Sequence, residues 1–124
     1  PAPLVGWLQL ISRRHVQGPA HFDPSEAAEF GIALQEASAA LERSSGALRV
    51  YAIAFGEGSP HLHVHLVPRY GDRPETAAWK VADWYRAVER GAIEAAMPER
   101  VASLNELVRH ALLAGSDRWR RPDA

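Results

Sequence analysis

The stretch His61-Leu62-His63-Val64-His65-Leu66-Val67 alternates histidine with apolar residues and then ends on two apolar residues. Side chains of a strand point alternately to its two faces, so the pattern predicts a strand with three histidines on one face and apolar residues on the other. The apolar face must pack against another element, which leaves the histidine face to a cleft or to solvent. Because a buried imidazole needs hydrogen-bond partners for its nitrogens, such a row reduces sheet stability unless it has a task. We therefore interpret it as a functional site.

The segments on either side of this row predict a sheet covered by a helix. Apolar stretches at 4–11 and 49–55 are expected to form strands beside the histidine strand at 61–68. Asp23-Pro24-Ser25-Glu26 has the residues of a capping box, so a helix is expected to run from there to residue 44. Its apolar residues recur in steps of three and four, and they would cover the apolar face of the histidine strand.

The last third of the chain is predicted to be helical. Apolar residues at helical spacing indicate helices over 76–90 and 98–113, within a C-terminal helical part at 76–115. Three aromatic residues fall in the first of these helices: Trp79, Trp84 and Tyr85. Aromatic residues at this spacing are more often part of a core than contacts of a ligand.

Length, composition and net charge limit the classes of protein to which the chain can belong. The 124 residues suit a single domain, 1–124, and 47% hydrophobic with 23% charged residues is typical of a soluble globular chain. A net charge of −1 gives no electrostatic basis for a nucleic-acid partner, and no stretch approaches the roughly 18 apolar residues of a membrane span. With no cysteine and no signal-peptide pattern at its start, the chain is expected to be cytoplasmic.

Two kinds of chemistry suit three imidazoles on one strand face, and the first is metal binding. Zinc requires ligand nitrogens about 2.0–2.1 Å away. Alternate strand residues lie about 6.6 Å apart, so two neighbours can converge on one ion, whereas about 13 Å separates His61 from His65. A metal site built from two of these histidines with His15 or Glu57 remains an alternative.

The second is phosphoryl chemistry, which needs less convergence. One neutral imidazole nitrogen can attack phosphorus, while another imidazole hydrogen-bonds the phosphate or protonates the leaving oxygen. Histidine, with an ordinary pKa near about 6.5, can do either at neutral pH. We interpret the isolated His21 and His110 as structural, because a lone histidine is more often structural than catalytic.

The sequence resembles the histidine triad family. Residues 61–67 match its motif, His-φ-His-φ-His-φ-φ with φ apolar, at every position. The Pro68-Arg69 that follows is similar to the branch of the fragile histidine triad and diadenosine polyphosphate hydrolases. The stretch Gly6-Trp7-Leu8-Gln9-Leu10-Ile11-Ser12-Arg13-Arg14-His15-Val16 looks like the family's strand that ends in a basic residue and His-Val. The match covers roughly 4–70, which would be the motif-bearing core of the domain.

This resemblance implies an α+β domain with an antiparallel sheet of about five strands, a crossing helix and additional C-terminal helices. It also implies a homodimer that joins two such sheets. The activity it implies is that of a hydrolase or nucleotidyl transferase acting through a covalent nucleotidyl-histidine. The bond attacked would be at the α-phosphate of a dinucleoside polyphosphate or a nucleoside phosphoramidate. No cofactor would be required, although a divalent metal can accompany a polyphosphate substrate.

The same resemblance assigns roles to individual histidines. His63 would be the nucleophile, with its other ring nitrogen held by a backbone carbonyl. His65 would contact the scissile phosphate and the leaving or entering oxygen. His61 and His15 would form a supporting hydrogen-bond relay, and none of these residues would be a metal ligand.

Phosphate binding would fall to the turn before the motif. Gly58 and Ser59 would hold phosphate oxygens, because backbone N–H groups of a glycine-containing turn can face an anion. Family members usually carry Gly-Gln or Gly-Ser where this chain has Gly56-Glu57. A carboxylate beside a phosphate is unfavourable unless it points away or is paired, for example with Arg69 or Arg13.

Two further departures favour an alternative function. The strand at 50–55 lacks the asparagine that the family often directs at the phosphate. Only five residues precede Gly6, where the family normally has another strand and turn. A nucleotide-binding regulatory module with little turnover is therefore kept beside the enzyme hypothesis.

Overall fold

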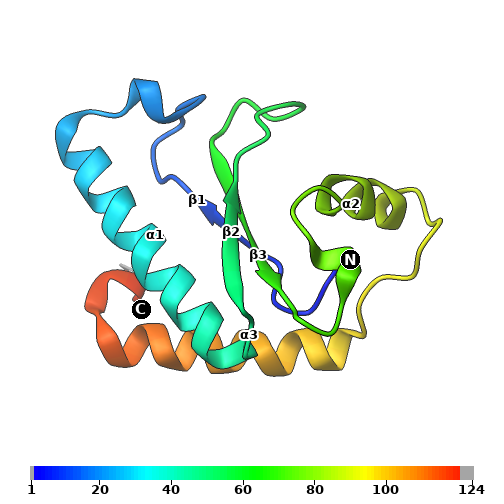
Figure 1. Cartoon of the computed structure of the whole chain (residues 1–124). Coiled ribbons are helices and arrows are strands. Elements are labelled where there is room, and N and C mark those ends of the chain that lie inside the picture. Colours follow the sequence, from blue (N-terminus) through cyan, green and yellow to red (C-terminus); the bar gives the residue numbers. More distant parts are fainter. Residues whose placement is uncertain (1, 121–124) are drawn as a thin grey trace.

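The computed structural model describes residues 2–120, so both ends of the expected domain 1–124 lie outside the described residues. The elements, with η for a short 3₁₀ helix, are β1 (Leu8–Ile11), η1 (Pro19–His21), α1 (Pro24–Ser45), β2 (Arg49–Ile53), β3 (His63–Arg69), η2 (Pro74–Thr76), α2 (Val81–Glu89), α3 (Pro98–Gly115) and η3 (Asp117–Trp119). Figure 1 shows α1 and α2 on opposite sides of the strands, with α3 running beneath α1. Within 2–120, no helix has the length and apolar character that crossing a bilayer takes.

The sheet of the described residues has three antiparallel strands in the order β1-β3-β2, and the expectation of about five strands is wrong for this part of the chain. The strand that carries the histidines, β3, is central. His63 pairs with Ile11 of β1, and His65 pairs with Gln9 of β1 and Ile53 of β2. Residues that pair directly share a face of the sheet, so this register decides what surrounds each imidazole.

The strands are shorter than the apolar stretches that predict them. β1 begins only at Leu8 because the preceding residues form a turn. In this turn the backbone N–H of Trp7 donates to the Leu4 carbonyl at 3.1 Å, and Gly6 adopts φ 91°. His61 lies before β3, so the expectation that all three histidines belong to one regular strand is wrong for His61. Within 70–120, the regular elements are all helices, so this described part adds no strand to the sheet.

Two apolar clusters pack on the two faces of the sheet. The larger joins the sheet to α1 and α3, and its buried members are Leu10, Val16, Ala37, Ala40, Leu41, Leu62, Val64, Leu66, Leu104 and Val108. This confirms that α1 covers the leucine and valine face of the histidine motif. The smaller lies on the α2 side, with Leu4, Trp7, Val67 and Val81 buried and Tyr51, Ile53, Tyr70, Trp84 and Tyr85 packed against them. The histidine face therefore looks toward an aromatic layer, which α2 helps to form.

The start of α1 is a capping box, as predicted. The Asp23 carboxylate accepts from the Glu26 N–H at 2.8 Å, and the Glu26 carboxylate accepts from the Asp23 N–H at 3.0 Å. The Arg14 guanidinium pairs with Glu26 at 2.7 Å. These contacts, Arg14 first and the Asp23 N–H second, lower the pKa of Glu26 to about 2. The box thus anchors the helix to the segment after β1.

Replacing the cap, Asp23→Ala, is expected to lower the free energy of unfolding by about 0.5–2 kcal/mol, because an N–H of the first helical turn loses its acceptor. Urea denaturation followed by circular dichroism measures the change. The matched control is Ser25→Ala in the same helical turn, where the exposed side chain is not the cap. Equal denaturation midpoints for the two variants would contradict the assigned role of Asp23.

Candidate active site

His63 opens β3 and is half-buried. Its Nδ1 lies 3.0 Å from the backbone carbonyl oxygen of His61. A carbonyl can only accept, so Nδ1 carries the proton and donates it. The neutral ring then keeps its lone pair on Nε2. The expected hydrogen bond to a backbone carbonyl is present, and it leaves Nε2 as the nitrogen with the free lone pair.

His65 is only 3% exposed, on the same face of β3. The indole N–H of Trp7 donates to its Nδ1 at 2.9 Å. Indole nitrogen is a donor only, so Nδ1 of His65 must be the acceptor and the ring proton sits on Nε2. His65 therefore has the opposite tautomer to His63.

Aromatic rings surround His65. Its ring centroid lies 5.2 Å from that of His63, 5.8 Å from Trp7, 5.3 Å from Phe55 and 5.5 Å from Tyr85. Burial first, and the neighbouring His63 second, lower the pKa of His65 below its ordinary value. A lowered histidine pKa means that the neutral ring persists to more acidic pH than in water. Both causes therefore favour the neutral form of His65.

His61 and His15 lie together beside this pair. The two rings stack with centroids 5.1 Å apart and an angle of 20° between their planes. Nε2 of His61 lies 2.6 Å from the backbone carbonyl oxygen of Ser12, so it donates its proton there. That bond goes to the backbone of the segment after β1 rather than to another histidine. The two residues thus meet by ring stacking, where a hydrogen-bond relay was expected.

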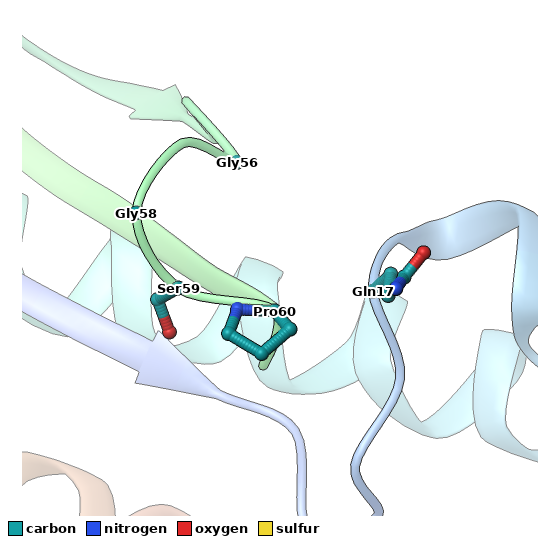
Figure 2. A pocket seen from close by; sticks show the side chains of 5 residues that line it. All are labelled: Gln17, Gly56, Gly58, Ser59 and Pro60. Carbon is teal, nitrogen blue, oxygen red and sulfur yellow. The ribbon is translucent and has the colours of Figure 1, made fainter.

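The turn before the motif borders a pocket of about 500 Å³ lined by Gly56, Gly58, Ser59, Pro60 and Gln17. Figure 2 shows Gln17 on a separate loop across from the other four residues. Gly56 and Gly58 both adopt φ 75°, a conformation that favours glycine. The predicted phosphate residues Gly58 and Ser59 thus lie in one pocket, but no histidine is among the residues that line it.

The carboxylate of Glu57 is exposed in this turn. Arg69, one of the two candidate partners, does not pair with it. Arg69 instead donates to the carbonyls of Tyr70 (2.5 Å) and Arg73 (2.8 Å) and to Oγ1 of Thr76 (3.0 Å). Since its guanidinium ties β3 to η2, it is committed to the structure of this corner. Glu57 therefore adds negative charge beside the pocket without compensation from Arg69.

Metal binding receives no support from the geometry. Across residues 2–120, no group of three or more histidine, aspartate or glutamate side chains is placed to hold an ion.

Sequence reasoning missed three residues of this site. From the sequence alone, Trp7 and Phe55 are apolar residues of the stretches 4–11 and 49–55, and Gln17 has no assigned role. The fold brings these residues to the site, and local sequence patterns do not show this. Trp7, for example, is 58 positions from His65 along the chain. Trp84 and Tyr85 pack in the smaller core cluster, as their spacing predicts, whereas Trp79 is 94% exposed. A polar-tipped aromatic residue on a strand predicted to pair with the histidine strand is the signal that points to Trp7.

Searches with models of known families and among curated protein sequences each found no match. Among solved structures, the fold is similar to that of a Hit-like protein from Bartonella henselae, described as involved in cell-cycle regulation and crystallised with an unknown ligand. The TM-score is 0.59 at 16% sequence identity, over 89% of this chain and 73% of the other. At this identity the likeness shows that the two chains share a fold.

Proposed function

We propose that this chain is a histidine triad hydrolase or nucleotidyl transferase that acts at the α-phosphate of nucleotides. The observation that carries the proposal is the pair of opposite tautomers on neighbouring residues of β3. His63 has a lone pair on Nε2, and His65 has a proton on Nε2. One ring is thus ready to attack an electrophile while the other can donate to the oxygens that gain charge. The match of 61–67 to the triad motif and the fold shared with a Hit-like protein support the same assignment.

The reaction would proceed in two displacements. In the first, the Nε2 lone pair of His63 forms a bond to the α-phosphorus, and the bond from phosphorus to the leaving group breaks with its electron pair on that group. The His61 carbonyl accepts the Nδ1–H of the cationic ring and stabilises it. In the second, water attacks phosphorus, the P–N bond breaks with its pair returned to Nε2, and the water proton goes to solvent. Another acceptor in place of water would make the reaction a transfer.

Several features would complete the active enzyme. The N–H groups and hydroxyl near Gly58 and Ser59 would bind phosphate oxygens, and a divalent cation would accompany a polyphosphate substrate. A homodimer would join two sheets through a strand edge. In the described part of the chain, both β1 and β2 have one edge without a neighbouring strand. We place the activity in the cytoplasm, in keeping with the absence of cysteine.

The test is to look for the covalent intermediate. The protein is incubated with a panel of dinucleoside polyphosphates and nucleoside phosphoramidates, and its intact mass is measured. In His65→Asn, loss of the Nε2–H donor is expected to slow turnover by about 10²–10³-fold. We expect this variant to accumulate one nucleoside monophosphate, which peptide mass spectrometry should place on His63.

The control for this experiment is His110→Asn, since His110 is exposed and pairs with Glu106 on α3. It should turn over substrates like the original chain. Measurable binding of mononucleotides, with no adduct and no turnover of any substrate, would instead favour the nucleotide-binding module. The exposed carboxylate of Glu57 beside the pocket, with which Arg69 does not pair, is the observation that favours this second function.

A further inference from the structure

The hydrogen bond from Trp7 to His65 is fixed by its surroundings. Trp7 is 9% exposed and packs in the smaller core cluster with Leu4, Val67 and Val81. Its ring lies 5.4 Å from that of Tyr85. A side chain held on several sides has little freedom to rotate away. This packing therefore keeps the indole N–H directed at Nδ1 of His65.

This bond limits the protonation states that His65 can adopt. An imidazole that accepts at Nδ1 carries its one proton on Nε2, and a second proton on Nδ1 would point at an indole N–H that cannot accept it. Protonation would break the bond and leave a buried donor without a partner. No carboxylate offsets this cost: within 2–120, the one histidine with a carboxylate oxygen within 4.0 Å of a ring nitrogen is His110, beside Glu106. Burial and His63 act in the same direction, by lowering the pKa of His65.

From these contacts, and resting on the proposed nucleotidyl chemistry, we infer that Trp7 is a positioning residue that keeps His65 a hydrogen-bond donor and prevents it from acting as a proton donor. The site then favours leaving groups that depart without a proton. Nucleotides whose α-phosphate is joined to another phosphate are the substrate class that this arrangement suits. Nucleoside phosphoramidates of basic amines are the class that it disfavours.

The reason lies in the proton balance of the first displacement. A neutral His65 that gave up its Nε2 proton would become an imidazolate anion, which is far too basic to form beside a phosphate. It can share that proton with a phosphoryl oxygen in a hydrogen bond, but it cannot transfer it. A phosphate leaving group takes the electron pair as a weakly basic anion and needs no proton. An amine must gain a proton from some other donor before it can leave.

The first test is spectroscopic and does not depend on turnover. Nitrogen-15 NMR of the whole chain at neutral pH distinguishes protonated from unprotonated ring nitrogens. We expect Nδ1 of His65 to be unprotonated, Nε2 to carry the proton, and a coupling across the hydrogen bond to join Nδ1 to the Trp7 N–H. Trp7→Phe should remove that coupling and shift the His65 tautomer ratio. A protonated Nδ1 in the unaltered protein would overturn the inference, even if Trp7→Phe failed to fold.

The second test is kinetic. Trp7→Phe frees Nδ1 to take a proton, so His65 could then act as an acid. The ratio of kcat/KM for an amine phosphoramidate to kcat/KM for a dinucleoside polyphosphate is expected to rise by about tenfold or more, since general acids contribute about 10²–10⁴-fold. The matched control is Trp84→Phe, which removes an indole N–H from the same cluster, where it donates to the Pro3 carbonyl at 2.9 Å.

The outcomes separate this inference from the function on which it rests. An unchanged ratio in Trp7→Phe, or an equal rise in Trp84→Phe, would overturn the inference while the nucleotidyl function stood. An unaltered protein that cleaves neither substrate class would contradict the proposed function, and the leaving-group preference would fall with it. The NMR result would still decide whether Trp7 holds the tautomer of His65.

Discussion

His63→Asn is expected to reduce turnover by about 10⁴-fold or more, because the nitrogen that forms the covalent intermediate is lost. The residue is half-buried at the start of β3 and lies outside both core clusters, so the fold should survive its replacement. The measurement is kcat on the best substrate of the panel, together with circular dichroism to establish folding. A folded His63→Asn variant with full activity would rule out His63 as the nucleophile.

A cavity variant sharpens this experiment. His63→Gly leaves space for a free imidazole, which can attack the α-phosphorus in place of the lost side chain. Added imidazole should restore part of the turnover to His63→Gly and none to His65→Asn, in which the nucleophile is still present. Rescue of both variants would indicate that imidazole acts in solution and not in the site.

The second large effect concerns stability. Leu41 of α1 is 0% exposed and belongs to the larger core cluster. Leu41→Ala is expected to lower the free energy of unfolding by about 2–5 kcal/mol, because it removes buried apolar surface and leaves a cavity. Domains are stable by only about 5–15 kcal/mol, so a large share of the stability would be lost. Denaturant unfolding gives the value directly.

Leu107→Ala is the control for the core variant. Leu107 is 57% exposed on α3, so its truncation should change stability by no more than about 0.5 kcal/mol. Similar losses in the two variants would show that Leu41 is not packed as described. Loss of nucleotide turnover at temperatures where Leu41→Ala is still folded would also be unexpected, because Leu41 packs on the face of the sheet opposite His63 and His65.

Local sequence signals predict α1 well. The extent and number of the strands depend on contacts between distant residues, so the sequence predicts them less well. The capping box and the apolar spacing placed that helix at 23–44, against an observed Pro24–Ser45, because both act within a few residues. The strands were overestimated because apolar composition extends into turns, as at residues 4–7. The count of about five strands came from family resemblance alone, and in residues 2–120 only three segments form strands.

The candidate site shows the same difference between local features, which the sequence predicts, and non-local contacts, which it does not. Alternation placed His63 and His65 on one face, and the pairing of β1 with β3 brought His15 near His61. The tautomers could not be predicted, because they depend on a carbonyl and an indole whose positions are set by the fold. The contact of Arg69 with η2 could not be predicted for the same reason, and it commits Arg69 to a partner other than Glu57.

The pairing of β1 with β3 has a consequence for molecules that fold incorrectly. A slip of one residue between strands moves every side chain to the opposite face. If β3 slipped against both β1 and β2, His63 and His65 would face the layer under α1, and Val64 and Leu66 would face the opposite side. Such a chain could not partly retain its chemistry, because the alternation that makes the site also makes the core. A molecule with the wrong register would therefore lose its core and its site together. A molecule in which His63 and His65 share the site face must also have its core assembled.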